Sequence, residues 1–182
     1  MQNIEPFYNW RHLYIASKDK QSPLFGYKNS EVIYTHSLYN FVIHPQWDSI
    51  GSETLFVKIL YVNYQKKFTV IELLGEWNDC INNDIMLFKT NVINSMIFNE
   101  INHFILICEN VLNFHFSDDC YYEEWYNEIY KGWITLINFK QHVLNEMNKI
   151  SLHKFMNQKT QWVNWRTFNP NQLHKLIEKE AY

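Results

Sequence analysis

Residues 68–77, FTVIELLGEW, open the stretch of sequence that decides the fold. Two more short apolar runs follow, HFILICEN at 103–110 and GWITLIN at 132–138, and each of the three precedes a helical pattern opened by Asn, Asp or Ser. Parallel strands need crossover helices, so this alternation predicts an α/β fold. Ligands of such sheets usually bind outside the carboxyl ends of the strands.

The run before this stretch predicts a hairpin. LFVKILYVNY (55–64) and the first apolar run flank the polar connection QKK (65–67), a spacing typical of two antiparallel strands with a three-residue loop. The predicted fold is therefore a mixed sheet in which an N-terminal antiparallel hairpin is followed by β-α-β-α-β-α. We assign 1–150 to a single α/β domain, with an irregular or strand-containing segment at 1–53 and the core at 54–150.

The remaining 32 residues, 151–182, are predicted to be a C-terminal extension with a short amphipathic helix after Pro170. Its QWVNWRTF stretch (161–168) either covers a sheet edge or anchors a partner. Inside the core, Asn78 or Asp79 is expected to cap the first helix, and Ser117 the second. The strand at 103 is expected to end at 110, with a loop before the second helix.

Composition excludes several function classes. The chain has 182 residues, a net charge of −3 and no block of five like charges, so we expect no nucleic-acid partner and no binding to a membrane surface. With four glycines and no nucleotide-binding motif, a phosphate-cradling loop is not expected, and we predict no cofactor. No signal peptide or membrane span is evident.

The cysteine pattern indicates a reducing compartment. Cys80, Cys108 and Cys120 are an odd number without CxxC spacing, which argues against a disulfide framework and against zinc, and predicts a cytoplasmic protein without a metal site.

Four polar side chains follow the ends of the predicted parallel strands and are candidate catalytic residues. Glu76 and Asp79 follow the first strand, and Glu109 and His115 the second. Carboxylates and an imidazole at one edge of a sheet could serve acid–base chemistry. The competing interpretation is that Asn and Asp at these positions cap helices.

Three further groups admit both a chemical and a structural interpretation. Glu72 lies on an otherwise apolar strand face, so it is either a buried general base with a raised pKa or a structural residue that pairs across the hairpin with a residue such as Lys58 or faces solvent. The acidic residues Asp118, Asp119, Glu123 and Glu124 complement a helix dipole without any metal; the two Asp with His115 could hold a divalent cation, but their spacing matches no defined motif. His36, His44 and Asp48 could serve a metal or acid–base chemistry, but without a third nearby ligand we interpret the histidines as structural.

The segment YYEEWYNEIY (121–130) carries more aromatic side chains than one buried helix stripe requires. Tyr121, Tyr122, Trp125 and Tyr126 are therefore candidate interaction residues, because Tyr and Trp dominate the energetics of protein interfaces. Aromatic residues make up 18% of the chain, so some of them must lie at the surface.

The segments ELLGEWND, HFILICENVLNFH and DDCYYEEWYNEI resemble an uncharacterised family of bacterial, Bacteroidetes-type proteins, which implies no activity. The order of elements over 54–150 is similar to that of STAS or SpoIIAA-like domains. That resemblance implies a regulatory protein that acts by protein–protein contact. The phosphorylatable Ser of that family has no match here; Ser117 is the sole hydroxyl in the corresponding 113–118 segment.

We therefore expect a non-enzymatic cytoplasmic protein that acts through a protein partner or as a homodimer. The alternative is a small-molecule-binding or hydrolytic enzyme with its site at the carboxyl ends of the parallel strands.

Overall fold

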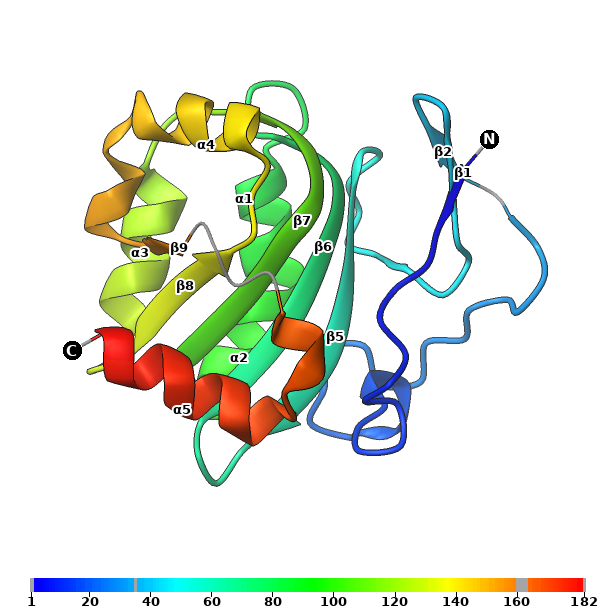
Figure 1. Ribbon diagram of the computed structural model, residues 1–182, viewed down its shortest axis with the longest axis horizontal. Helices are drawn as coiled ribbons and strands as arrows, with labels where there is room; N and C mark the ends of the chain where they lie inside the picture. The colour runs from blue at the N-terminus through cyan, green and yellow to red at the C-terminus, as the bar shows by residue number, and fades with distance from the viewer. Residues whose placement is uncertain (1, 35, 160–163, 182) are drawn as a thin grey trace.

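A computed structural model describes residues 2–34, 36–159 and 164–181, and it confirms the α/β class (Figure 1). The main sheet has six strands in the order β4-β5-β6-β7-β8-β9. Their bounds are β4 (Asp48–Ser49), β5 (Leu55–Asn63), β6 (Phe68–Asn78), β7 (His103–His115), β8 (Trp133–Ile137) and β9 (Asn157–Lys159). A second, three-stranded sheet contains β1 (Gln2–Ile4), β2 (Ser37–Leu38) and β3 (Phe41–Ile43).

The predicted order of core elements is confirmed. β5 and β6 form the antiparallel hairpin, and β6, β7 and β8 are parallel neighbours joined by helical crossovers. The first crossover contains α1 (Asp84–Phe88), a π-helical turn η2 (Lys89–Ile93) and α2 (Asn94–Phe98). The second crossover contains α3 (Cys120–Glu128), and α4 (Gln141–Asn148) follows β8. Short 3-10 turns lie at η1 (Ala16–Lys18), η3 (Ser151–Lys154) and η4 (Trp165–Thr167), and α5 (Pro170–Ala181) is the last helix.

Two large hydrophobic cores lie on opposite faces of the sheet, and a third, smaller cluster contains Ile43, Trp47, Phe56 and Leu74. Helices α1 to α4 cover one face, whose core includes Ile71, Leu73, Trp77, Phe88 and Trp125. Helix α5 and the N-terminal segment cover the other face, whose core includes Phe68, Val70, Ile105, Trp165 and Ile177. In Figure 1, α5 crosses in front of the sheet and the other helices lie behind it or above it. The alternation of side chains along β6 supplies both cores.

Strand β7 is longer than the sequence pattern predicts. It continues to His115 rather than ending at 110, and it pairs with β6 as far as Asn78 opposite His115. The expected loop at 111–119 is therefore mostly strand. The register shifts twice in this pairing, and at the second shift Gly75 has φ +117. A Cβ there would lie 1.9 Å from the carbonyl oxygen of Thr54, so only glycine fits.

The helix starts also differ from the prediction. α1 begins at Asp84 rather than directly after Asp79, and α3 begins at Cys120, where the side chain of Asp118 rather than Ser117 accepts the Cys120 N–H. The N-cap residue of α4, Lys140, makes no side-chain capping hydrogen bond, and Asn138, two residues earlier, has a positive φ of 62°.

The segment after 150 is part of the same fold. β9 pairs in parallel with β8 at the edge of the sheet, and α5 packs its apolar side chains against the second core. The predicted helix after Pro170 is confirmed. Of the QWVNWRTF stretch, residues 161–163 lie outside the described residues, and Trp165 is fully buried.

Candidate functional site

Three of the four candidate catalytic residues lie near one another at the paired ends of β6 and β7, where the Asp79 N–H donates to the His115 carbonyl at 2.8 Å, and Glu109 lies further back along β7. Glu76 accepts a hydrogen bond from Asn113, 3.2 Å away, and His115 is exposed at the end of β7. Asp79 is buried on the face covered by α1 to α4, whereas Glu109 is held by Arg166 near the opposite core. Their described hydrogen bonds link none of the four side chains to another.

The stagger of the strand ends explains the distance between Glu109 and the other three residues. β8 pairs with β7 only as far as Ile107 opposite Ile137, and β7 then continues for eight more residues. At about 3.3 Å per residue, its end lies roughly 26 Å beyond that of β8. Glu109 therefore lies level with the end of β8, far below His115. A shared crevice at the strand ends would need ends at similar height.

Asp79 serves the local structure of the chain. Its carboxylate accepts hydrogen bonds from the Tyr122 hydroxyl at 2.6 Å, the Ile85 N–H at 2.9 Å and the Trp77 indole at 3.1 Å. Burial raises its pKa to about 6, and these three donors oppose the rise. The helix-cap interpretation fits Asp79, because it satisfies an N–H in the first turn of α1.

Glu72 is a buried carboxylate, as one of the two interpretations expected. It is 1% exposed and accepts hydrogen bonds from the Phe7 N–H at 2.9 Å and from Asn110 at 3.3 Å. Burial, together with the nearby negative charge of Glu109, raises its pKa to about 7. Lys58 is its register partner across the hairpin, as predicted, but its ammonium turns to other acceptors.

The aromatic residues of α3 divide between core and surface. Tyr122 and Trp125 are fully buried, so neither can contact a partner without unfolding of the helix. Tyr121 is partly buried against the same core, and Tyr126 is 44% exposed. Glu124 and Glu128 from this helix bind the buried ammonium of Lys89, at 2.7 Å and 2.9 Å, which ties α3 to the π-helical turn.

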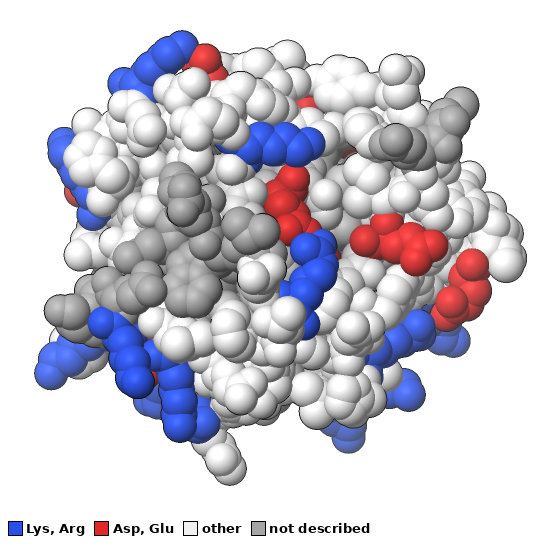
Figure 2. Space-filling view, in the orientation of Figure 1, with Lys and Arg blue, Asp and Glu red and all other residues white. Residues whose placement is uncertain are grey.

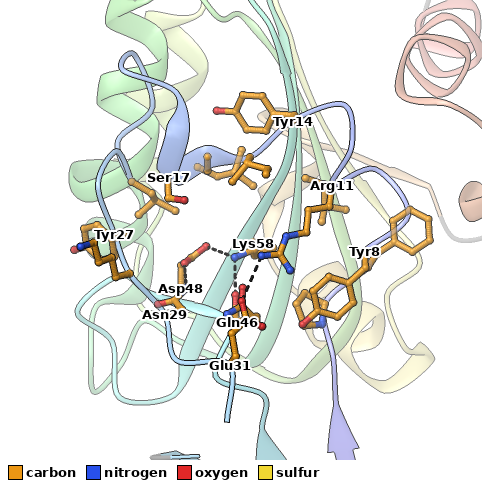
Figure 3. Close-up of a pocket in the computed structure, with 18 residues that line it drawn as sticks. Tyr8, Arg11, Tyr14, Ser17, Tyr27, Asn29, Glu31, Gln46, Asp48 and Lys58 are labelled. Carbon is orange, nitrogen blue, oxygen red and sulfur yellow. Dashed lines mark hydrogen bonds and ion pairs between the residues drawn. The ribbon is translucent and has the colours of Figure 1, made fainter. Parts of the chain in front are cut away.

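A cavity of about 360 Å³ lies at the open edge of β5, beneath the N-terminal segment (Figure 3). β4 pairs only with Phe56 and Val57, so the next residues of β5, Lys58 to Leu60, line the cavity instead of a neighbouring strand. The opposite wall comes from residues 6–31, which contain only the short turn η1. The volume is within the range of small-ligand pockets.

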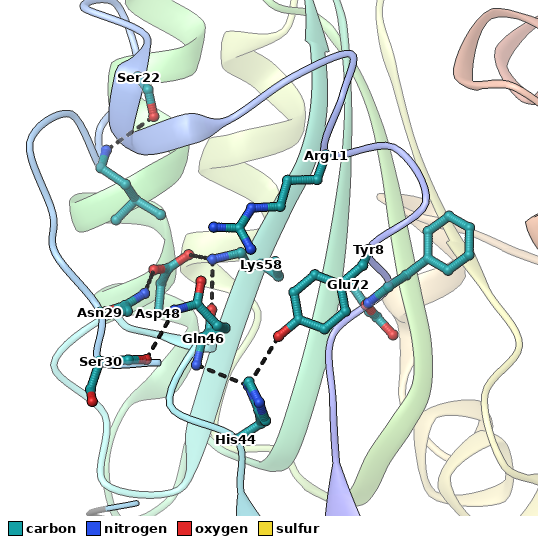
Figure 4. Close-up of polar contacts among 12 residues, drawn as sticks. Tyr8, Arg11, Ser22, Asn29, Ser30, His44, Gln46, Asp48, Lys58 and Glu72 are labelled. Atoms are coloured by element: carbon teal, nitrogen blue, oxygen red, sulfur yellow. Dashed lines mark hydrogen bonds and ion pairs between the residues drawn. The ribbon is translucent and has the colours of Figure 1, made fainter. Parts of the chain in front are cut away.

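Lys58 is the central charge of this cavity. Its Nζ donates to the Gln46 carbonyl at 2.6 Å and to Asp48 at 3.1 Å, and Asp48 also accepts from Asn29 (Figure 4). An ammonium has three donors, so one remains after these two bonds. At the rim, Arg11 pairs with Glu31 at 3.5 Å.

Lys28 also lines the cavity, and no described residue accepts a hydrogen bond from it. The lining thus carries three cations, Arg11, Lys28 and Lys58, against two anions, Glu31 and Asp48. Both anions already have partners, so the unsatisfied charge in the cavity is positive.

Beside these charges, Tyr8 and His44 form a small aromatic wall. The Tyr8 hydroxyl lies 3.1 Å from His44 Nδ1, and the Gln46 N–H also points to that nitrogen, at 3.2 Å. Nδ1 therefore acts as an acceptor, and the imidazole carries its proton on the other nitrogen. Burial raises the pKa of Tyr8 to about 12, with the nearby Glu5 adding to the rise, so the phenol is uncharged at neutral pH.

Exposed apolar side chains concentrate in residues 25–39, which we call the apolar segment. Six exposed large apolar residues fall in it, of eleven in the described chain: Phe25, Tyr27, Val32, Ile33, Tyr34 and Tyr39. Val32 is 78% and Ile33 63% exposed. Tyr27 also lines the cavity, so the apolar segment and the cavity adjoin. Contiguous exposed apolar surface marks interaction sites more often than chance does.

Sequence patterns could not have located this region. The residues around the cavity come from irregular segments without a hydrophobic period, and only the run VIY at 32–34 signals apolar character. Lys58, by contrast, stands out as a charge inside an apolar strand. Over the face drawn in Figure 2, acidic and basic side chains are interspersed, without a field of one sign.

No family model and no curated protein matches this chain. Within residues 2–34, 36–159 and 164–181, no helix is long and apolar enough to cross a lipid bilayer.

Proposed function

We propose that this protein is a non-enzymatic binding protein that holds a protein partner on the apolar segment and accepts an acidic group of that partner into the adjoining cavity. The observation that carries the proposal is the concentration of exposed apolar side chains in residues 25–39, beside a cavity with an unsatisfied positive charge. Apolar anchors beside a polar pocket are the usual anatomy of a protein interface.

The arrangement of the candidate catalytic residues supports a binding role over hydrolysis. A general acid and base must converge on one reacting group, but Glu109 lies further back along β7 and is paired with Arg166. The Asp79 carboxylate is buried and already accepts three hydrogen bonds. The resemblance to STAS domains, which act through protein contacts, agrees with a regulatory role. We place the protein in the cytoplasm, because Cys80, Cys108 and Cys120 are all free thiols.

The test uses charge substitutions in the apolar segment. A purified partner, identified by site-specific photo-crosslinking at Val32, should bind the wild-type protein and lose at least ~10-fold in affinity with the double variant Val32→Asp, Ile33→Asp. The matched control is Phe98→Asp, because Phe98 is 87% exposed but lies at the end of α2, outside the segment. Equal loss in the control, or no loss in the double variant, would overturn the proposal.

The cavity gives a second readout. Arg11→Ala combined with Lys28→Ala removes two of its three cations at exposed positions, and affinity should fall further at low salt than at high salt. A salt-independent effect would contradict the acidic-group contact.

A second candidate function is the binding of a small anionic molecule in the same cavity, favoured by its volume of about 360 Å³. Dicarboxylates would then raise the melting temperature of the wild-type protein and not that of the Arg11, Lys28 double variant. The substitutions in the apolar segment would leave this shift unchanged, which separates the two functions.

A further inference from the structure

Two histidines and a glutamate converge where α5 meets the start of β7. His103 is the first residue of β7, and His174 and Glu178 are four residues apart on α5. That spacing places both α5 residues on one face of the helix. His174 is 5% exposed, and the other two are partly buried. One potential ligand atom from each side chain lies within 4.8 Å of those of the other two.

The two imidazoles face each other through ring nitrogens. Nδ1 of His103 lies 2.9 Å from Nε2 of His174. Two nitrogens bound to one tetrahedral Zn²⁺ at about 2.0–2.1 Å would lie about 3.3 Å apart. A small increase in the distance between the two ring nitrogens therefore accommodates the ion. The Glu178 carboxylate lies within 4.8 Å of both nitrogens, and a partly exposed glutamate can approach a bound ion by rotamer change.

Packing holds both rings in place. His174 stacks on Phe68, with ring centroids 4.2 Å apart, and His103 stacks on Trp133, with centroids 4.7 Å apart. Ligands on regular elements with locked rotamers are the condition for a preorganised metal site. The site therefore requires little ordering of its two nitrogen ligands.

The donor set also suits a transition metal. Neutral imidazole is the form that binds a metal ion, with its proton on the opposite ring nitrogen. Two imidazoles and one carboxylate leave a fourth position for water, and imidazole favours Zn²⁺, Co²⁺ or Ni²⁺ over Mg²⁺ or Ca²⁺.

We propose that His103, His174 and Glu178 form a site for a divalent transition-metal ion, zinc being the natural occupant, that fastens α5 to the sheet. The histidines are 71 residues apart in sequence, so only the H-x3-E spacing on α5 could signal the site from the chain alone. The proposal is independent of the partner surface, which lies beside β5. A metal bound only by the folded state raises the stability of that state.

The test starts from full-length protein treated with a chelator and dialysed. Added ZnCl2 should raise its melting temperature, MgCl2 should not, and isothermal titration should give one zinc per chain. Co²⁺ should produce the visible bands of a four-coordinate ion. Glu178→Gln changes a partly exposed ligand, should fold, and should weaken zinc binding at least ~10-fold; His174→Gln should abolish it.

The matched control is His153→Gln, an exposed histidine on η3, which should leave both zinc binding and the cobalt spectrum unchanged. If zinc shifts the wild-type protein and the Glu178 and His174 variants equally, the ion binds elsewhere and the proposal is wrong. If zinc produces no shift in wild-type protein, the His103–His174 contact is a structural hydrogen bond only, which also overturns it.

Discussion

Replacing Glu72 with glutamine should stabilise the protein at alkaline pH. The carboxyl is 1% exposed, and its pKa rises to about 7 in the folded protein from an ordinary value of 4.5. Below pH 4.5 the Glu72 carboxyl is protonated in both the folded and the unfolded chain, so its titration then has little effect on the free energy of unfolding. Between pH 4.5 and 7 the unfolded chain ionises first, and stability falls as pH rises.

The size of the effect follows from that interval. Each pKa unit corresponds to about 1.4 kcal/mol, so the wild-type protein loses about 3 kcal/mol between pH 4.5 and pH 8 through this one group. Glutamine has the shape of the protonated acid and never ionises. Its carbonyl can accept the Phe7 N–H, and the Asn110 amide can rotate to accept from the new NH2 group.

The assay is urea denaturation of wild-type and Glu72→Gln protein at pH 4.5, 6, 7 and 8.5. The difference in free energy of unfolding should be small at pH 4.5 and reach about 3 kcal/mol in favour of the variant at pH 8.5. Glu53→Gln, which alters an exposed carboxylate, should give a difference near zero throughout. A Glu72→Gln difference that does not change with pH would refute the buried-carboxyl reasoning.

Four further variants test the packing by urea denaturation, which measures the free energy of unfolding. Gly75→Ala should cost about 3 kcal/mol or more, because its Cβ would collide with the Thr54 carbonyl; a cost below 1 kcal/mol would contradict the geometry. Tyr122→Phe should lower the free energy of unfolding by about 2 kcal/mol and raise the pKa of Asp79 further, so this loss should be larger at pH 8 than at pH 4. Equal losses at the two pH values would exclude the hydrogen bond from Tyr122 to Asp79. Lys89→Met should lower the free energy of unfolding by only about 1 kcal/mol, because the half-exposed partners Glu124 and Glu128 return to water. Changing both glutamates to Gln should lower it by about 3 kcal/mol, because the buried ammonium then has no carboxylate partner, and a larger loss for Lys89→Met would refute this reasoning.

The hairpin and the parallel strands could be predicted because their signals are local. Apolar runs of strand length, a polar three-residue connection and helical periodicity each fix one element without reference to the rest of the chain. The second half of β7 was not predicted as strand, because polar and apolar residues are mixed from Glu109 to His115. In this stretch β8 no longer pairs with β7. β9 was not predicted because its three residues are all polar and show no pattern typical of a strand.

The candidate site could not be predicted to the same degree. Placing Glu76, Asp79, Glu109 and His115 together assumes that neighbouring strands end at the same height, and strand length is set by pairing rather than by the local pattern. For Tyr122 and Trp125, the sequence leaves open which stripe of α3 faces the sheet. The residues of the cavity and of the proposed metal site come from segments far apart in the chain, and only the folded topology brings them together.

The arrangement of the two cores has a consequence for biosynthesis. The face covered by α1 to α4 can close as soon as β8 and α4 have left the ribosome, since its helices alternate with its strands. The other face depends on Trp165, Leu173 and Ile177, which are synthesised later. Until then only the N-terminal segment, with Phe7 and Trp10, can cover Phe68, Val70 and Ile105, and much of this apolar surface stays open. Such a nascent intermediate is prone to aggregate, and premature termination near residue 160 would leave it permanently in that state.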